Sequence, residues 1–156
     1  KLKTSTEQLE AISGYFKEYP NDILGKLLPT IIDRIYVYGE LTEIEPVEFR
    51  FFIERPVFTS ESILEVVWKN SNKENAVKHL KHVSEILSGA DFSSIEVLKQ
   101  VIMPYAEIEG KGNVLWPLRM SLSGKQKSVD PFTICYVLGK DEVRIRIDSA
   151  IKMLDS

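Results

Sequence analysis

The stretch from Asn72 to Gly89 constrains the fold of this chain more than any other. Its apolar residues recur at helical spacing, at Val77, Leu80, Val83, Ile86 and Leu87. A stripe with this period lies along one face of an α-helix. Asn72 is a favoured N-cap residue, and glycine often follows the last turn of a helix. We therefore predict a helix between these two residues, with an apolar face that must pack against other elements.

Runs of the same kind along the rest of the sequence predict an all-α protein. We expect one helix from about Thr4 to the residues before Pro20, and others at 23–38, 63–69, 95–105 and 140–154. Pro29 lies within the second run, which predicts either a kink there or a helix that begins near Leu28. Residues 91–94, which include Ser94, predict a cap for the helix at 95–105. Pro104 falls late in that run and predicts a bend. No internal repeat interrupts this pattern.

Two segments fit both a helix and a strand. Residues 47–54 are short, aromatic and strongly apolar, which alone is compatible with a strand. Their length and their helical neighbours favour a helix. Residues 143–147 alternate apolar and charged side chains, as a strand does, whereas Ala150, Ile151 and Leu154 follow at helical spacing.

Composition excludes several classes of protein. With 44% hydrophobic and 28% charged residues in 156, the chain has an ordinary globular composition, and no apolar run approaches the ~20 residues of a membrane span. The first residues lack the apolar core of a signal peptide. Because the chain begins with Lys1 and not Met, we expect it to be part of a longer protein. Cys135 is the single cysteine, and its apolar neighbours predict a small buried side chain in a reducing compartment.

The segment from Gly110 to Gly139 carries a local charge that opposes that of the whole chain. The chain has 20 Lys and Arg against 23 Asp and Glu, yet residues 111–129 contain four cations and no acid. We expect a flexible hinge at 110–112 and then a helix with Pro117 in its first turn and three leucines facing inward, Leu115, Leu118 and Leu122. The Arg119 side chain would point away from the buried face of this helix. A cationic loop between packed helices suits an anionic partner, most often a phosphate.

Several short motifs in this segment resemble a known family. WPLR at Trp116–Arg119 is followed by SLSGK at Ser121–Lys125, then by Ser128, Pro131 and Phe132, and by LGK at Leu138–Lys140. In order and spacing they resemble the C-terminal anticodon-binding region of bacterial-type glutamyl-tRNA synthetases. The resemblance implies an all-α fold of the class I synthetase anticodon-binding (α-helix cage) type. It implies a first helical subdomain at residues 1–60 and a C-terminal one at 61–156, and it favours a helix at 140–154.

The resemblance also implies roles for individual residues. Arg119, Ser128 and Pro131 align with positions that contact anticodon bases in those synthetases. Unstacked RNA bases are read by stacking and by hydrogen bonds at their edges, which suits an arginine, a hydroxyl and a flat apolar surface. Lys125 and Lys127 are expected to contact phosphates, which adds affinity without sequence information.

In the first subdomain, Arg34 matches a recurrent arginine of the family. That subdomain helps to read the third anticodon base. The sequence departs from the family pattern at Val37 and Tyr38, where the family has Thr-Leu, and its net charge of −3 does not favour RNA.

Each of these residues also has a structural interpretation. Arg119 could form an intramolecular salt bridge, Ser128 could cap the following helix, and Pro131 could simply occupy the first turn of that helix. Trp116 is interpreted as a core residue rather than a stacking platform. His79 and His82 are three residues apart on one helix, but no third ligand is evident, so we interpret them as packed or solvated and not as a metal site.

The resemblance implies a parent enzyme that uses ATP and Mg²⁺ to attach glutamate to its tRNA. No HIGH-like or KMSKS-like signature of a catalytic half occurs here. We therefore expect a segment without catalytic residues, cofactor or metal, acting as a cytoplasmic monomer that binds the anticodon loop of tRNA(Glu) and no membrane. The alternative is an α-helical protein-interaction module without an RNA role, which predicts an exposed apolar groove.

Overall fold

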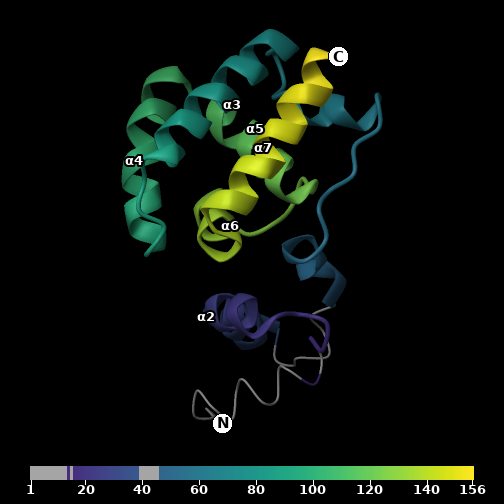
Figure 1. The fold of residues 1–156 in the computed structure, drawn as a ribbon, viewed down its shortest axis with the longest axis vertical. Coiled ribbons are helices and arrows are strands. Elements are labelled where there is room, and N and C mark those ends of the chain that lie inside the picture. Colours follow the sequence, from purple (N-terminus) through teal and green to yellow (C-terminus); the bar gives the residue numbers. More distant parts are fainter. Residues whose placement is uncertain (1–13, 15, 39–45) are drawn as a thin grey trace. The chain divides into compact units, whose positions relative to one another are not determined.

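A computed structural model describes Gly14, residues 16–38 and residues 46–156 of the chain. These residues form six α-helices and two short 3-10 helices, and this part of the chain contains no strand (Figure 1). The all-α prediction is confirmed. Contacts divide the chain into two compact units, Lys1–Glu54 and Arg55–Ser156, which we describe separately. The assignment of residues 1–60 and 61–156 to two anticodon-binding subdomains stays a prediction.

The first unit has an aromatic core around one helix. Helix α2 spans Asn21–Tyr38, and the 3-10 helix η2 spans Pro46–Phe52. Leu24, Leu27 and Ile31 are buried on one face of α2, as their spacing predicts. The aromatic side chains of the core are Phe16, Tyr19, Phe49, Phe51 and Phe52. The Phe16 and Tyr19 rings meet edge to face, with centroids 5.1 Å apart.

Two sequence predictions for this unit are corrected. Helix α2 begins at Asn21 and continues through Pro29, so a later start near Leu28 is wrong. The Pro29 side chain lies on the exposed side of the helix. Residues 46–52 form a 3-10 helix, so the strand alternative for 47–54 is wrong as well. The helix expected from about Thr4 lies almost entirely outside the described residues.

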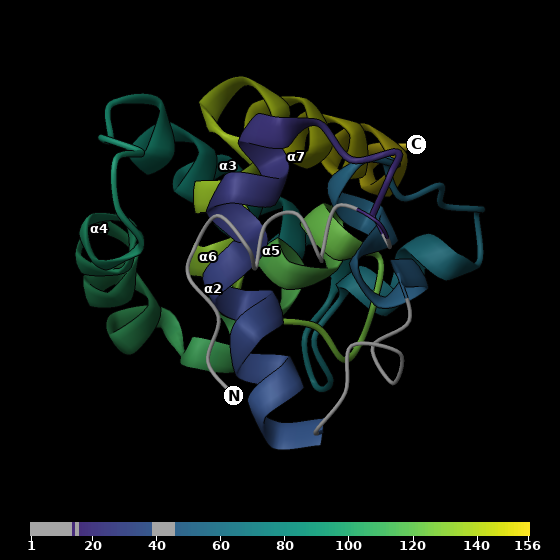
Figure 2. The same ribbon diagram turned by 90° about the horizontal axis from the view of Figure 1, so that it is seen from below.

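In the second unit, helix α5 lies in the middle of the bundle. The elements are η3 at Ser62–Val66, α3 at Lys73–Ser88, α4 at Ile95–Glu109, α5 at Lys111–Ser123, α6 at Pro131–Leu138 and α7 at Lys140–Asp155. Helices α3, α4, α6 and α7 and the short η3 all pack against α5 (Figures 1 and 2). Helix α5 is buried on several sides, at Val114, Pro117, Leu118, Met120 and Leu122. A helix surrounded in this way loses its amphipathic character.

The predicted capping residues act as expected. The Asn72 side chain accepts a hydrogen bond from the Asn75 N–H at 2.8 Å at the start of α3, and Gly89 follows its last residue. Ser94 caps α4 in the same way, accepting from the Val97 N–H at 3.2 Å. These bonds satisfy amide groups that a helix leaves unpaired at its first turn.

Four predictions for the second unit differ from the structure. The helix expected at 63–69 is the shorter 3-10 helix η3, because the chain becomes extended at Val67 and Trp68 then packs on α5. Gly112 and Pro117 both lie inside α5, so neither the hinge at Gly112 nor the first-turn position of Pro117 is correct. The strand alternative for 143–147 is wrong, because α7 is continuous.

Candidate nucleic-acid interface

The cationic loop, residues 124–130, begins at a position that requires glycine. Gly124 follows the last residue of α5 with a φ of 68°, in the left-handed region, and its N–H donates to the Met120 carbonyl oxygen at 2.8 Å. A Cβ atom at Gly124 would lie 2.8 Å from the Cβ of Pro56. Backbone conformation and close packing therefore both fix the direction in which the loop leaves the helix.

Ser123 ties the start of the loop to the last turn of α5. Its buried hydroxyl donates to the Arg119 carbonyl oxygen at 2.8 Å and accepts from the Lys125 N–H at 3.1 Å. Two residues earlier, the Ser121 hydroxyl donates to the Pro117 carbonyl oxygen at 2.7 Å. Serine hydroxyls in these positions satisfy carbonyl and amide groups at a helix end.

The Arg119 side chain extends from α5 to the later part of the loop. Its Nη1 lies 3.4 Å from the Ser128 carbonyl oxygen, a long and weak hydrogen bond. Arg119 forms no salt bridge with any residue that the structure describes. Because a guanidinium has five N–H donors, most of its donors remain available for another acceptor.

The loop ends at Asp130, which caps helix α6. Its carboxylate accepts from the Thr133 N–H at 2.9 Å and from the Thr133 hydroxyl at 2.8 Å. The alternative in which Ser128 caps this helix is therefore wrong. The Ser128 hydroxyl instead donates to the Val129 carbonyl oxygen at 2.9 Å.

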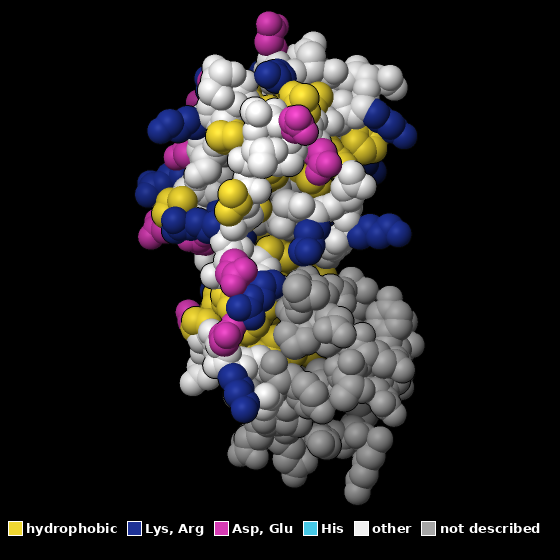
Figure 3. All heavy atoms as spheres, turned by 90° about the vertical axis from the view of Figure 1, so that its right-hand side faces the viewer, with side chains coloured by type: hydrophobic (Ala, Val, Ile, Leu, Met, Phe, Trp, Pro, Cys, Tyr) yellow, Lys and Arg dark blue, Asp and Glu magenta, His cyan; other side chains and the backbone are white. Residues whose placement is uncertain are grey.

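Lys125 and Lys127 are the exposed cations of the loop. Neither forms an ion pair with a residue in the described part of the chain. On the face of the molecule shown in Figure 3, basic and acidic side chains are interspersed.

Three apolar residues near the loop are packed. Pro131 and Phe132 are buried in the first turn of α6, so neither offers an open flat surface in this structure. Trp116 is half-buried, and its indole N–H donates to the Glu65 carbonyl oxygen at 2.8 Å. Its ring centroid lies 5.2 Å from that of Trp68. Trp116 packs as the core interpretation predicts.

The sixth candidate, Arg34, belongs to the first unit. It lies in helix α2, and its side chain falls outside the described part of the structure. The structure thus groups Arg119, Lys125, Lys127 and Ser128 around one loop, with Pro131 just after it.

A buried arginine that the sequence did not single out supports this loop. Arg146 on α7 is buried, and its Nη1 donates to the Leu122 carbonyl oxygen at 2.6 Å. Its Nε donates to Glu142 at 2.8 Å. Leu122 is in the last turn of α5, where carbonyl groups lack helical partners, so Arg146 satisfies one directly before the loop. Arg146 lies three residues after Val143 and four before Ala150, so it shares their buried face; that spacing is the signal that could have found it.

Glu142 joins Arg146 to the first residue of the second unit. Arg55 donates to both oxygens of the Glu142 carboxylate, at 2.8 Å and 2.9 Å. The hydrogen bond from Arg55, together with that from Arg146, outweighs the effect of burial and lowers the pKa of Glu142 to about 2. Burial lowers the pKa of Arg146, but guanidinium groups remain charged in proteins.

This arrangement predicts a loss of stability in acid. The pKa of Glu142 is lowered from 4.5 to about 2, so its stabilising contribution is complete above pH 4.5 and disappears as the pH falls towards 2. We expect roughly 2–3 kcal/mol of unfolding free energy to be lost across this range through Glu142. Denaturant unfolding at pH 6 and pH 3 measures it.

The controls for this experiment are two neutral variants. Glu142→Gln should show a smaller loss between pH 6 and pH 3 than the unchanged chain, whereas Glu107→Gln, at an exposed position on α4, should show the same loss. Equal acid sensitivity in all three proteins would contradict the assignment to Glu142.

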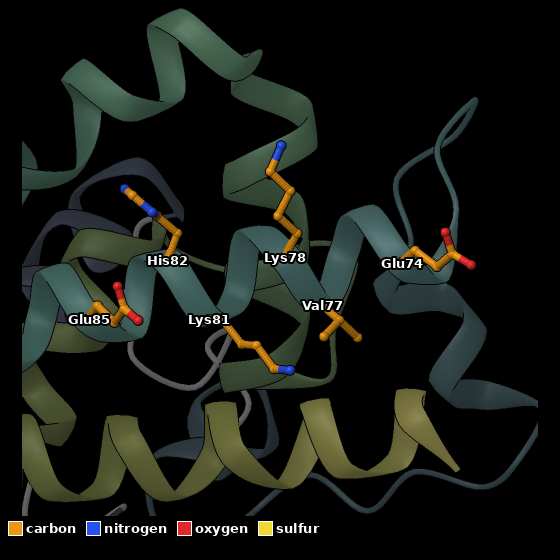
Figure 4. A pocket seen from close by; sticks show the side chains of 6 residues that line it. All are labelled: Glu74, Val77, Lys78, Lys81, His82 and Glu85. Atoms are coloured by element: carbon orange, nitrogen blue, oxygen red, sulfur yellow. The ribbon is translucent and has the colours of Figure 1, made fainter.

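The two histidines form a packed cluster with Tyr105. His79 is buried, and its Nδ1 lies 2.7 Å from the Tyr105 hydroxyl, while the His82 ring stacks on Tyr105 with centroids 4.0 Å apart. Burial lowers the pKa of His79. In the open recess along α3, His82 and Lys78 point to one side and Lys81 to the other (Figure 4). These side chains do not converge on a ligand.

The described residues contain no group of three His, Cys, Asp or Glu side chains that could hold a metal ion. Cys135 is fully buried in α6, as predicted, and burial raises the pKa of its thiol. Within the described part of the chain, no helix is long and apolar enough to cross a membrane.

The fold and the loop define an anticodon-binding domain. A family model described as "Anticodon binding domain" matches residues 4–151, and the chain belongs to this family. The resemblance noted in the sequence is therefore confirmed.

Proteins similar to this chain are glutamate–tRNA ligases. The enzyme of Bacteroides thetaiotaomicron is 27% identical over 98% of this chain and 30% of its own length. The enzyme of Streptomyces coelicolor is 31% identical over 82% of this chain and 25% of its own length. The crystal structure of a glutamate tRNA ligase from Elizabethkingia meningosepticum has a TM-score of 0.65 and 28% identity, and the match covers 94% of this chain and 30% of that one. The chain thus spans 25–30% of the length of these relatives.

Proposed function

We propose that this chain is the tRNA-binding part of a glutamate–tRNA ligase and reads the anticodon loop of tRNA(Glu). Membership of the anticodon-binding family supports a tRNA partner. The observation that carries the proposal is the group of three cations formed by Arg119 at the end of α5 and by Lys125 and Lys127 in the cationic loop, with no acid between residues 111 and 129. Both ends of the loop are fixed by hydrogen bonds, so these cations are displayed on a rigid support.

The residues divide into those that read bases and those that bind phosphate. Arg119 has a planar guanidinium with free donors, which can bond a base edge. Ser128 and Pro131 would complete the base-reading set, and Pro131 would do so only if the loop opens on binding, because it is buried here. Lys125 and Lys127 would contact backbone phosphates. Arg34 would contribute from the first unit.

The parent enzyme would use ATP and Mg²⁺ to join glutamate to this tRNA in the cytoplasm. Its catalytic half would lie in the part of the relatives that this chain does not span. In this proposal the present segment holds no cofactor and binds its tRNA as a monomer.

The protein-interaction alternative receives no specific support. It requires an apolar groove on the surface. The exposed large apolar side chains come from separate segments, and none of them lines the two recesses found on the second unit; they are Val57, Leu64, Ile95, Ile108 and Ile145.

Replacing Arg119 tests the base-reading role. Arg119→Ala should weaken binding to the tRNA(Glu) anticodon stem-loop by roughly 1–3 kcal/mol and remove the preference for it over a loop with a changed middle base. Arg119→Lys should keep much of the affinity and still lose the preference, because lysine lacks the planar fork. Fluorescence anisotropy at two salt concentrations measures both quantities.

Lys99→Ala on α4 provides a control for the loss of one exposed cation. It should leave the preference unchanged. If the unchanged chain binds the cognate and the altered anticodon stem-loops alike, and modest salt abolishes the binding of both, only general phosphate attraction is present. The anticodon-reading proposal is then wrong.

A further inference from the structure

A small recess between α3 and α7 lies outside the cationic loop. It has a volume of about 70 Å³ and is lined by Ser84, Leu87, Ser88, Lys140, Val143, Arg144 and Ile147. Ser84 and Ser88 are one helical turn apart on α3, and Lys140 and Arg144 are one turn apart on α7. Residues four apart share a face of a helix, so two serines of α3 and two cations of α7 line the recess together with apolar side chains. The Ser88 hydroxyl donates to the Glu85 carbonyl oxygen at 2.7 Å, which leaves the Ser84 hydroxyl as the donor for a ligand.

Lys140 is held at the rim of this recess. Its ammonium donates to the Ser88 carbonyl oxygen at 3.2 Å and lies 5.7 Å from the centroid of the Phe92 ring. One of its three N–H donors is used by the carbonyl, which leaves the others for a further acceptor.

Arg144 has no partner in the structure. It is exposed and forms no hydrogen bond or ion pair with any described residue, although Asp148 follows it by one turn. No carboxylate lines the recess. The positive charge of Lys140 and Arg144 is therefore not neutralised within it.

We propose that this recess binds a phosphate group, supplied by the backbone of the tRNA. Tetrahedral oxyanions suit a site that combines a guanidinium, an ammonium and a hydroxyl donor, here those of Arg144, Lys140 and Ser84. A recess this small admits a single group of that kind and no base. The source of the phosphate rests on the proposed function, whereas the chemistry of the recess does not. It would add affinity at a second place on the unit without reading sequence.

Arg144→Gln tests the proposal, and Lys152→Gln is its matched control. Both residues are exposed cations on α7, and each substitution removes one positive charge. Binding of a full-length tRNA(Glu) transcript is measured at 50 and 200 mM salt. A lost phosphate contact should make the decrease in affinity between these salt concentrations about threefold smaller in Arg144→Gln. Lys152→Gln should behave as the unchanged chain.

The preference between cognate and altered anticodons separates this proposal from the proposed function. Arg144→Gln should weaken the binding of both tRNAs equally, whereas Arg119→Ala should remove the preference between them. If Arg144→Gln and Lys152→Gln have the same salt dependence while Arg119→Ala still removes the preference, the recess proposal is wrong and anticodon reading stands.

Titration with inorganic phosphate distinguishes free phosphate from the tRNA backbone as the ligand of the recess. In amide NMR spectra, phosphate should shift the signals of Ser84, Ser88 and Arg144, and these shifts should disappear in Arg144→Gln. Shifts with phosphate but an unchanged salt dependence with tRNA would overturn the RNA source and assign the recess to free phosphate. No shifts and no change in salt dependence would overturn the site itself.

Discussion

Replacing Arg146 with methionine should destabilise the second unit by roughly 2–4 kcal/mol. Methionine fills much of the same volume but cannot donate hydrogen bonds. The Leu122 carbonyl oxygen, at the end of α5, would lose its donor, and Glu142 would keep only Arg55. An unpaired polar group next to a buried face costs more than the hydrogen bond contributed, so the effect exceeds that of an exposed charge.

Tryptophan fluorescence during denaturant unfolding measures this effect. Both tryptophans of the chain, Trp68 and Trp116, lie in the second unit and report its unfolding. Arg146→Lys should recover part of the loss, because it keeps the charge but can reach only one of the two acceptors at a time. Arg55→Gln, at an exposed position, should cost less than Arg146→Met, because solvent screens an exposed ion pair. A cost for Arg146→Met no larger than for Arg55→Gln would show that the buried contacts contribute little.

The second large effect is expected at Gly112. Alanine normally stabilises a helix relative to glycine by about 1 kcal/mol. At Gly112 the added Cβ would lie 2.8 Å from Cζ2 of Trp68 and closer still to Cε2 and Nε1. Trp68 packs beside Trp116, which is itself hydrogen-bonded to Glu65, so the ring has little freedom to move. We expect Gly112→Ala to be destabilising by roughly 1–3 kcal/mol in spite of its better helix propensity.

Gly25 provides the matched control for this substitution. It lies inside helix α2, and a Cβ there would meet nothing within 4 Å. Gly25→Ala should therefore stabilise the chain by roughly 0.5–1 kcal/mol. Adding Trp68→Leu to Gly112→Ala should recover part of the loss by removing the clash. If Gly112→Ala stabilises the chain as Gly25→Ala does, the close approach of Trp68 does not constrain this position.

The sequence predicted those parts of the fold that depend on local chemistry. Asn72 and Ser94 cap their helices because their side chains satisfy nearby amides, whatever lies around them. The apolar stripe after Asn72 identified the face of α3 that is buried. The motifs around Arg119 predict the family, and the family match agrees with them.

Features that depend on distant contacts could not be predicted. The spacing of Arg146 from Val143 and Ala150 indicates its buried face, but nothing local shows that Leu122 faces it from another helix. Proline is typical of a first turn, but Pro117 lies six residues after the start of α5, which is held by packing on several sides. The helix expected at 63–69 is shorter than predicted because Trp68 packs against Gly112 of α5. Local spacing does not reveal this contact between distant segments.

The burial of Cys135 has a chemical consequence. Thiols react as thiolates, and burial both raises the pKa of this thiol and shields it from reagents. Oxidants and alkylating agents can therefore reach it only when the helices around it separate. The susceptibility of this chain to oxidative damage at its single cysteine is then set by how often the second unit opens, and any change that loosens the bundle also exposes it to that chemistry.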